Sequence, residues 1–333
     1  PMDPWFADTT QVDLNQLGRR YVVTDYGVST DSTQVQTQAL QRVIDRCASE
    51  GGGVVVVPRG TFLSGSLYFR QGTHLQVEEG GRLKGSDRIA DFDLRTTRIE
   101  GETCTYYTAL INADGLDGFV IAGPGTIDGN GRSSHVTVQN IHLTNSPFWT
   151  NHLYRCHHVR YLNAHITSPT EGLKAPSSDA IDIDVCHDVL VSGCYMSVNG
   201  DAVALKGGKG TWADRDSTNG PNRNILIERC LYGTVHGCLT LGSESIEDHN
   251  VVLRHCHANN ANRVLWLKMR RDTPQRYESV SVENITGRTG SFLVVRPWTQ
   301  FFKPADRADM PLSECRDIQI RDIHMDCNNF FDV

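Results

Sequence analysis

The sequence predicts an all-β fold, a parallel β-helix whose N-terminal end is covered by one α-helix. Two observations carry this prediction: a short V-x-V strand recurs from residue 136 onward, and a small or apolar residue follows each copy at the same offset. The copies are spaced by about twenty to forty residues, as expected for one supersecondary unit per repeat. A chain of 333 residues is long for one compact core but suits a single elongated stack, so we expect residues 1–333 to form one domain.

The covering helix is predicted over residues 33–50. Apolar residues recur there at helical spacing and share one face, and Gly51 to Gly53 end the segment. A helix in this position would protect the first open edge of the solenoid from pairing with other chains.

The repeats place equivalent residues in columns. The V-x-V copies begin at Val136, Val159, Val189, Ile225, Val251, Val280 and Ile318. One interior column contains Cys194, Cys230 and Cys256, and this pattern favours buried free thiols over disulfides. The "CHH" at 156–158 and "HCH" at 255–257 suggest metal ligands, but strand alternation points Cys256 away from both neighbours. No metal site is therefore predicted.

A second strand follows each middle V-x-V copy, and it decides how "SVNGDAVALKGG" at 197–208 is interpreted. Asn199-Gly200 is typical of a tight hairpin turn. However, "AVALK" at 202–206 belongs to a series with "AIDID" at 180–184 and "CLTLGS" at 238–243. The series indicates a rung of a stack, with Asp201 at its edge.

Composition excludes two classes of partner. The net charge of −7 argues against a nucleic-acid binder, which carries a broad basic face. No apolar run approaches the ~18 residues that span a membrane, so no membrane insertion is expected. The opening "PMDPWFADTT" shows no apolar signal segment.

Several ordered motifs resemble glycoside hydrolase family 28, the polygalacturonases and rhamnogalacturonan hydrolases. The motifs are "DYGVSTDSTQVQTQALQRVIDRCASEGGGVVVVPRGTFLSGSLYF", "GPGTIDGNG", "NSPFWTNH", "SSDAIDID", "VHGCLTLGSE" and "LWLK". The resemblance implies a right-handed parallel β-helix that cleaves α-galacturonosyl links in pectin with inversion, without metal or cofactor. A secreted or periplasmic location is expected. Family members usually carry a longer segment after "GTIDGNGR", so a missing or deleted piece is predicted near 132–135.

The resemblance assigns site positions to matching residues, with two departures. The matching positions are Asp179, Asp182, Asp201, His236, Glu244 and Lys268, and Gly242-Ser243-Glu244 resembles exo-acting members. Gly200 stands where the family has the acid that protonates the leaving oxygen, and Trp266 stands where it has an arginine.

The strand alignment predicts how this site would work. It places Asp179 and Asp201 in one column on adjacent rungs, about 5 Å apart. Carboxylates this close raise one pKa and can hold a water, so they are predicted as the base pair. The alternative is two solvated loop aspartates. The proton donor that replaces the missing acid is sought among His236, Asp182 and Glu244.

The substrate is predicted to combine a uronate with a less acidic sugar. Trp266 offers an apolar face to a neutral sugar, or else it is a core residue. Local positive charge is expected from Lys206, Lys268 and Arg270. The polar loop 207–224, with Trp212 as a sugar platform, would close one end of the cleft and favour exo cleavage.

The leading interpretation is therefore an inverting, exo-acting glycoside hydrolase. Its partner would be a pectic polysaccharide or oligosaccharide that contains galacturonic acid and possibly rhamnose. The alternative is a catalytically impaired glycan-binding β-helix, because Gly200 lacks the expected acid group. A lyase on the same scaffold fits less well, since it would need Ca²⁺ or a strong basic residue near the cleaved unit.

Overall fold

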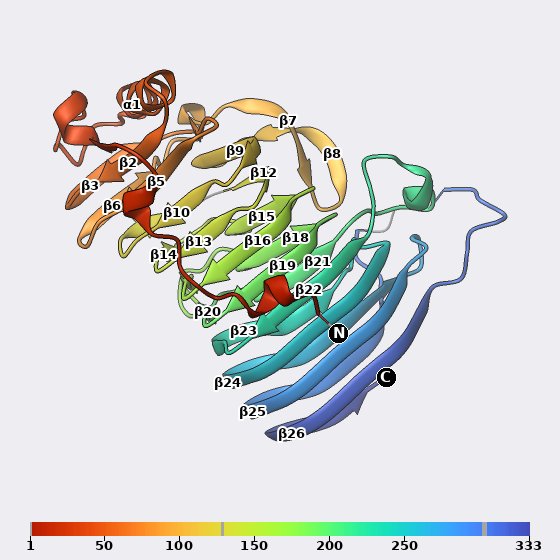
Figure 1. Ribbon diagram of the computed structural model, residues 1–333. Helices are drawn as coiled ribbons and strands as arrows, with labels where there is room; N and C mark the ends of the chain where they lie inside the picture. The colour runs from red at the N-terminus through yellow and green to blue at the C-terminus, as the bar shows by residue number, and fades with distance from the viewer. Residues whose placement is uncertain (1, 128–129, 302–304) are drawn as a thin grey trace.

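The computed structural model describes residues 2–127, 130–301 and 305–333, and for residues 130–134 it describes the backbone alone. Figure 1 shows one elongated stack of strands, with α1 (Thr37–Ser49) lying across its N-terminal end. All strand pairs of the large sheet are parallel, and the antiparallel pair β7–β8 forms a separate ribbon. The fold is a parallel β-helix with an N-terminal helix, as predicted.

The strands wind around the stack in chain order. The first half contains β1 Arg20–Val22, β2 Gly53–Val57, β3 Gly60–Ser64, β4 Leu67–Tyr68, β5 Thr73–Val77, β6 Gly81–Gly85, β7 Leu94–Ile99, β8 Glu102–Tyr107, β9 Ile111–Asp117, β10 Val120–Ala122, β11 Thr126–Ile127, β12 Asn130–Ser134 and β13 Thr137–Gln139. The second half contains β14 His142–Thr144, β15 Asn151–Tyr154, β16 His157–Leu162, β17 His165–Thr167, β18 Ile181–Asp184, β19 His187–Ser192, β20 Tyr195–Ser197, β21 Val203–Lys206, β22 Asn222–Glu228, β23 Leu231–Leu241, β24 Glu247–Arg270, β25 Arg276–Trp298 and β26 Glu314–Asp332. Short 3-10 helices are η1 Pro4–Ala7, η2 Leu14–Gln16, η3 Val23–Tyr26, η4 Ile89–Asp91 and η5 Ala213–Arg215.

The strand registers confirm the repeat columns. The V-x-V starts pair directly along the stack: Val159 with Val189, Val189 with Ile225, Ile225 with Val251, Val251 with Val280 and Val280 with Ile318. Because strand side chains alternate in direction, an in-register stack puts every apolar member of a column in the interior.

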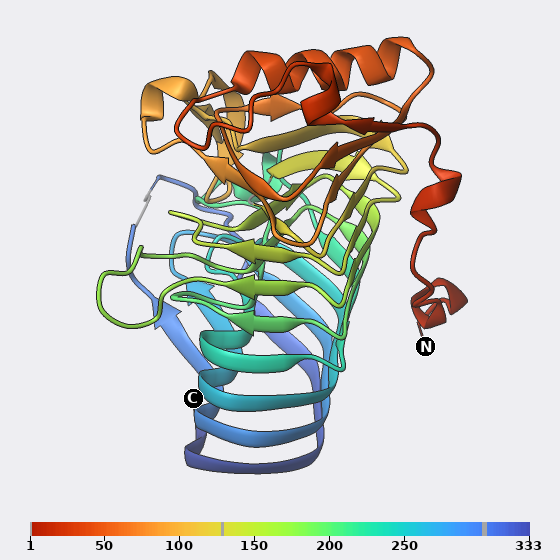
Figure 2. The same cartoon turned by 90° about the vertical axis from the view of Figure 1, so that its left-hand side faces the viewer.

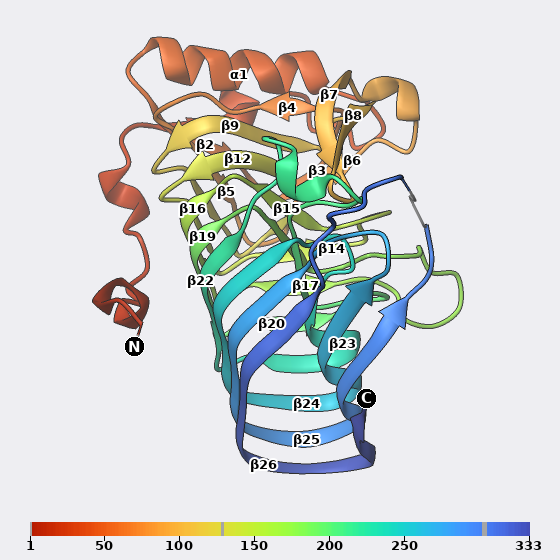
Figure 3. The ribbon, with the colours of Figure 1, turned by 90° about the vertical axis from the view of Figure 1, so that its right-hand side faces the viewer.

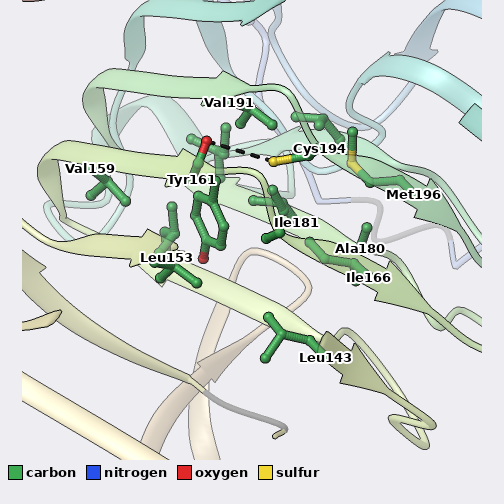
Figure 4. Close-up of a cluster of buried hydrophobic side chains, with 14 of the residues drawn as sticks. Leu143, Leu153, Val159, Tyr161, Ile166, Ala180, Ile181, Val191, Cys194 and Met196 are labelled. Atoms are coloured by element: carbon green, nitrogen blue, oxygen red, sulfur yellow. Dashed lines mark hydrogen bonds between the residues drawn. The ribbon is translucent and has the colours of Figure 1, made fainter. Parts of the chain in front are cut away.

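The interior is a continuous apolar core that runs along the stack. Figure 4 shows Tyr161 and Cys194 in it among aliphatic side chains, with the Cys194 thiol 3.6 Å from the Tyr161 carbonyl oxygen. The cysteines of the described structure are free, and Cys194, Cys230 and Cys256 are buried as predicted. They pack as small apolar residues.

The Asn199-Gly200 pair does not form a hairpin. It lies between β20 and β21, which pair in parallel with strands of the neighbouring coils. The prediction of a stacked rung is confirmed.

Two features were not predicted. The hairpin β7–β8 leaves the stack and extends over the coils that follow it (Figures 1 and 3). An N-terminal arm runs down the outside of the solenoid (Figure 2), where Phe6 packs on Leu162, Leu190 and Leu226.

The missing or deleted piece predicted near 132–135 falls largely on β12. The side chains of this strand lie outside the described residues, so the missing piece remains a prediction.

Among the described residues, none of the helices has the length and apolar character needed to cross a bilayer.

Candidate active site

Asp179 and Asp201 lie on adjacent rungs, each just before a strand. β18 and β21 pair in register from Ile181 and Val203, so the aspartates two residues earlier face each other. The Ala180 N–H donates to the Asp201 carbonyl at 2.9 Å, and the Asp201 N–H donates to Asp179 Oδ1 at 2.9 Å. Both aspartates are only 5% exposed. The alternative of two solvated loop aspartates therefore does not fit the structure.

Asp182 forms a carboxyl pair with Asp179. Burial, and then the charge of Asp201, raises the pKa of Asp179 to about 6. Burial and the charge of Asp179 raise the pKa of Asp182 well above its usual range. Of the two carboxyls, Asp182 is therefore the one whose pKa is raised more strongly. This pair retains a proton under conditions in which ordinary aspartates are ionised.

Gly200 lies directly against the Asp179 carboxylate. A Cβ atom at position 200 would be 2.3 Å from Asp179 Oδ1 and 3.0 Å from the Asp179 amide nitrogen. Any other residue at position 200 thus requires Asp179 to move. The space that a side chain would need is occupied by the Asp179 carboxylate, which bonds to the Asp201 amide.

His236 occupies the rung after Gly200, as the alignment predicts. Its N–H donates to the Gly200 carbonyl at 2.8 Å, and its ring Nε2 lies 3.2 Å from Asn199 Oδ1. Burial lowers its pKa, although the charge of Asp201 acts in the opposite direction. A neutral imidazole in contact with an amide is a poor proton donor.

Lys268 lies between Asp201 and two indole rings. Its Nζ is 3.8 Å from Asp201 Oδ2, 3.9 Å from the Trp266 ring centroid and 4.2 Å from that of Trp298. The guanidinium of Arg263 also lies over the Trp266 ring, 3.7 Å from its centroid. Trp266 thus packs against two cations.

Sequence reasoning missed Arg263, although a signal for it existed. The register continues the Asp179–Asp201 column through Gly237 to Arg263, since Gly237 pairs with Arg263. Extending that column by two rungs would have placed a guanidinium beside the carboxylates. The Arg263 guanidinium thus places positive charge beside Trp266, the position at which the resemblance leads us to expect an arginine.

Lys206 and Glu244 form a second, buried ion pair. Lys206 Nζ donates to Glu244 Oε2 and to the Gly242 carbonyl, both at 2.9 Å. Burial alone would raise the pKa of Glu244, but Lys206 and the Ser243 hydroxyl hold it at about 2. Glu244 is therefore expected to be ionised at neutral pH.

Arg270 and Trp212 both contact charged side chains of the protein itself. Arg270 forms a two-point pair with Asp272 at 2.8 and 2.9 Å, and its side chain is 1% exposed. Trp212 is exposed on the 207–224 loop, and its ring contacts the guanidinium groups of Arg215 and Arg307. Neither position brings the side chain to the Asp179–Asp201 pair, and substrate binding by Arg270 and Trp212 stays a prediction.

The hairpin β7–β8 covers the site through a buried arginine. Arg98 Nε donates to Asp184 Oδ2 at 2.8 Å, and its Nη2 donates to Asn219 Oδ1 at 2.8 Å. The same Asp184 oxygen lies 3.0 Å from His152 Nε2. At the hairpin turn, Gly101 lies against Glu244 and Gly208, where an added Cβ would be 3.0 Å from Glu244 Cβ. The hairpin and the 207–224 loop therefore meet above β18 and β21.

A cavity of about 760 Å³ lies beside this cover. Its walls include Arg98, Tyr106, Trp149 and His152. The aspartate pair is outside its lining, but His152 pairs in register with Asp182, so cavity and carboxylates share a wall. Its size is within the range of small-ligand sites.

Several buried acceptors in this region lack a partner within the described structure. They are Asp182 Oδ1 and Oδ2, Asp184 Oδ1, Asp201 Oδ1, Thr150 Oγ1 and Thr240 Oγ1. Buried polar atoms are almost always hydrogen-bonded, so a cluster of unpaired ones marks a place for water or a polar ligand. A hydroxyl-rich ligand would supply the missing donors.

Comparisons with known proteins agree with this geometry. The model of glycosyl hydrolases family 28 matches residues 132–289. A probable polygalacturonase of Vitis vinifera is 26% identical over 257 residues, covering 66% of this chain and 50% of that protein. An exo-poly-alpha-D-galacturonosidase of Dickeya chrysanthemi is 25% identical over 251 residues, covering 73% of this chain and 37% of that protein.

A solved structure extends the likeness to most of the fold. The polygalacturonase from Erwinia carotovora ssp. carotovora superposes with a TM-score of 0.74 at 18% identity, covering 90% of this chain and 93% of that chain. The chain spans half or less of the length of the two curated relatives above. With the stacked β-helix and the aspartates on adjacent rungs, these matches agree on one likeness: the chain is similar to glycosyl hydrolases family 28 over residues 132–289, a little under half of its length.

Proposed function

We propose that the protein is an inverting, exo-acting glycoside hydrolase that cleaves galacturonic-acid-containing pectic chains outside the cell or in the periplasm. The observation that carries this proposal is the buried carboxyl cluster of Asp179, Asp182 and Asp201 beneath a cover, with unpaired acceptors around it. Inverting hydrolysis needs a protonated carboxyl on one side and an ionised carboxylate that holds water on the other.

Asp182 is the proton source in this proposal. Of the three candidates, Glu244 is fixed as a carboxylate by Lys206, and His236 is kept neutral by burial. Asp182 is the carboxyl whose surroundings keep it protonated, and Asp179 relays the proton toward the cleft. Asp201, beside the Lys268 ammonium, holds the attacking water.

Exo action is supported by the cover. The hairpin β7–β8 and the 207–224 loop meet through Arg98 and Asn219 at the C-terminal end of β18, the strand that follows Asp179. A chain end fits such a site, whereas the middle of a polymer would have to thread beneath the ribbon.

The product of the reaction tests the function directly. Incubation with pectic oligosaccharides, followed by NMR of the first-formed reducing sugar, should give the inverted anomer, with products released from one chain end. An unsaturated product would indicate a lyase. The retained anomer would contradict the proposed roles of the carboxylates.

The uronate-binding residue is predicted to be Arg263. Replacing Arg263 with Gln removes a cation that packs on Trp266, so KM for oligogalacturonide should rise by about tenfold or more, as expected for a lost charge-assisted hydrogen bond. kcat should change less than KM. Steady-state kinetics measure both, and Arg20→Gln, at an exposed ion pair far from the site, serves as the control. An unchanged KM would exclude Arg263 as the carboxylate ligand.

A second function, a glycan-binding protein with an impaired catalyst, is favoured by Gly200 alone. In Gly200→Asp, the added side chain meets the Asp179 carboxylate, so that carboxylate has to leave its place on the Asp201 amide. If the site is disabled, this variant should gain about 10²–10⁴-fold in kcat, the usual contribution of a general acid. If Asp182 supplies the proton, the variant should be slower than the parent, because the Asp179–Asp182 pair is broken. Glycan binding by titration calorimetry, measured in parallel, separates an inactive binder from a misfolded protein.

A further inference from the structure

A cluster of imidazole rings lies on the outside of the solenoid, at a corner that the proposed reaction does not use. We call it the histidine corner: His135, His157, His158 and His187, with Asp188. His157 and His187 pair in register at the starts of β16 and β19, and their rings stack with centroids 5.0 Å apart. The rings of His135 and His158 stack at 5.0 Å as well.

The backbone brings neighbouring side chains together at this corner. His158 and Asp188 have φ of 54° and 57°, in the left-handed region, so strand alternation does not hold there. His157 Nδ1 and His158 Nδ1 consequently lie 2.8 Å apart although the residues are sequential.

The geometry offers a set of ligand atoms for one ion. One ligand atom from each of His135, His157 and His158 falls within 4.8 Å of the others, and the same holds for His158, His187 and Asp188. His158 is common to both sets.

Carboxylates orient the outer rings. His135 Nδ1 lies 2.7 Å from Asp117 Oδ1, and His187 Nδ1 lies 2.7 Å from Asp188 Oδ2. When Nδ1 binds a carboxylate, the proton is fixed there and Nε2 keeps its lone pair for a metal. This carboxylate–histidine arrangement is the usual support of metal-binding imidazoles.

We propose that the histidine corner binds one divalent transition-metal ion of the Zn²⁺ type, with His135, His157 and His158 as nitrogen ligands and water as the fourth. Nitrogen ligands with one carboxylate suit Zn²⁺ better than Ca²⁺ or Mg²⁺, which prefer oxygen. The role of the ion is structural. The ion would link His135, in the segment after β12, to His157 and His158 on β16. The Trp5 ring of the N-terminal arm packs edge-on against His158, with the ring centroids 5.2 Å apart.

The test is metal binding by the full chain after treatment with a chelator. Equilibrium dialysis against Zn²⁺, with metal counted by mass spectrometry, should give one ion per chain. Because His158 belongs to both ligand sets, His158→Gln should abolish stoichiometric binding. Asp117→Asn should weaken binding by about 10- to 100-fold, the usual effect of losing a supporting carboxylate.

A matched control is available on the same solenoid. His142 and His165 also stack, with centroids 4.8 Å apart, but they do not belong to either ligand set. His165→Gln should therefore bind Zn²⁺ like the parent. Co²⁺ should give the visible absorption of a four-coordinate site in the parent and in His165→Gln, and lose it in His158→Gln. Equal Zn²⁺ binding by the parent and His158→Gln, or equal loss in both variants, would overturn the proposal.

Discussion

Asp182→Asn is expected to lower kcat on oligogalacturonide by about 10²–10⁴-fold, the usual contribution of a general acid. Asparagine has nearly the shape of aspartate but cannot release a proton to Asp179. In the parent, activity should fall as pH rises and the Asp179–Asp182 pair loses its shared proton; the variant should lack this alkaline limb. The profile of kcat against pH measures both effects.

Stability measurements distinguish this result from unfolding. Burial raises the pKa of Asp182, and a group with a raised folded-state pKa gives stability that is present below its unfolded pKa and lost as pH rises through the folded value. At neutral pH and above, Asp182→Asn should therefore be as stable as the parent or more so. His236→Gln provides the matched comparison, since it should keep the alkaline limb. If His236→Gln loses that limb and Asp182→Asn keeps it, the assigned proton source is wrong.

Arg98→Ala is expected to reduce the free energy of unfolding by about 3–5 kcal/mol, the usual cost of removing one partner from a buried ion pair. Arg98 and Asp184 are fully covered, with side-chain exposures of 1% and 0%. Without the guanidinium, the buried Asp184 carboxylate keeps the contact of its Oδ2 with His152 Nε2 at 3.0 Å but loses its ion-pair partner. Urea denaturation measures the loss.

The same hairpin supplies a control for Arg98. Arg95 lies on β7 but is exposed, 3.8 Å from Asp93, so Arg95→Ala should cost under about 1 kcal/mol. Adding Asp184→Asn to Arg98→Ala should recover part of the stability, because the uncompensated buried charge disappears. Hydrogen exchange should show opening of β7–β8 in Arg98→Ala only. A loss no larger than that of Arg95→Ala would mean that Arg98 does not hold the cover.

The fold was predictable because its information is local and repeated. Each V-x-V copy has the same alternation of apolar residues. Because the strands stack in register, equivalent residues of successive copies lie in columns such as Val189, Ile225 and Val251. The adjacent-rung placement of Asp179 and Asp201 follows from the same alignment. The helix at the N-terminus could be predicted from its own periodicity, within a few residues of its ends.

The cover could not be predicted in this way. The hairpin β7–β8 has no equivalent in the other coils, and Arg98 reaches Asp184, which is 86 residues away in the sequence. No periodicity links those two positions. The histidine corner was missed for a related reason, since the positive φ at His158 is a property of the folded corner, and the alternation rule assumes a regular strand.

The sequence by itself therefore determined the β-helix, its register and the column that holds the carboxylates, because each depends on residues repeated once per coil. Only the tertiary structure decided the charge states around them. Burial raises the pKa of Asp182, the Lys206 ammonium lowers that of Glu244, and the absence of a Cβ at Gly200 admits the Asp179 carboxylate. These effects depend on which groups are removed from water together, and that is fixed by segments far apart in the chain.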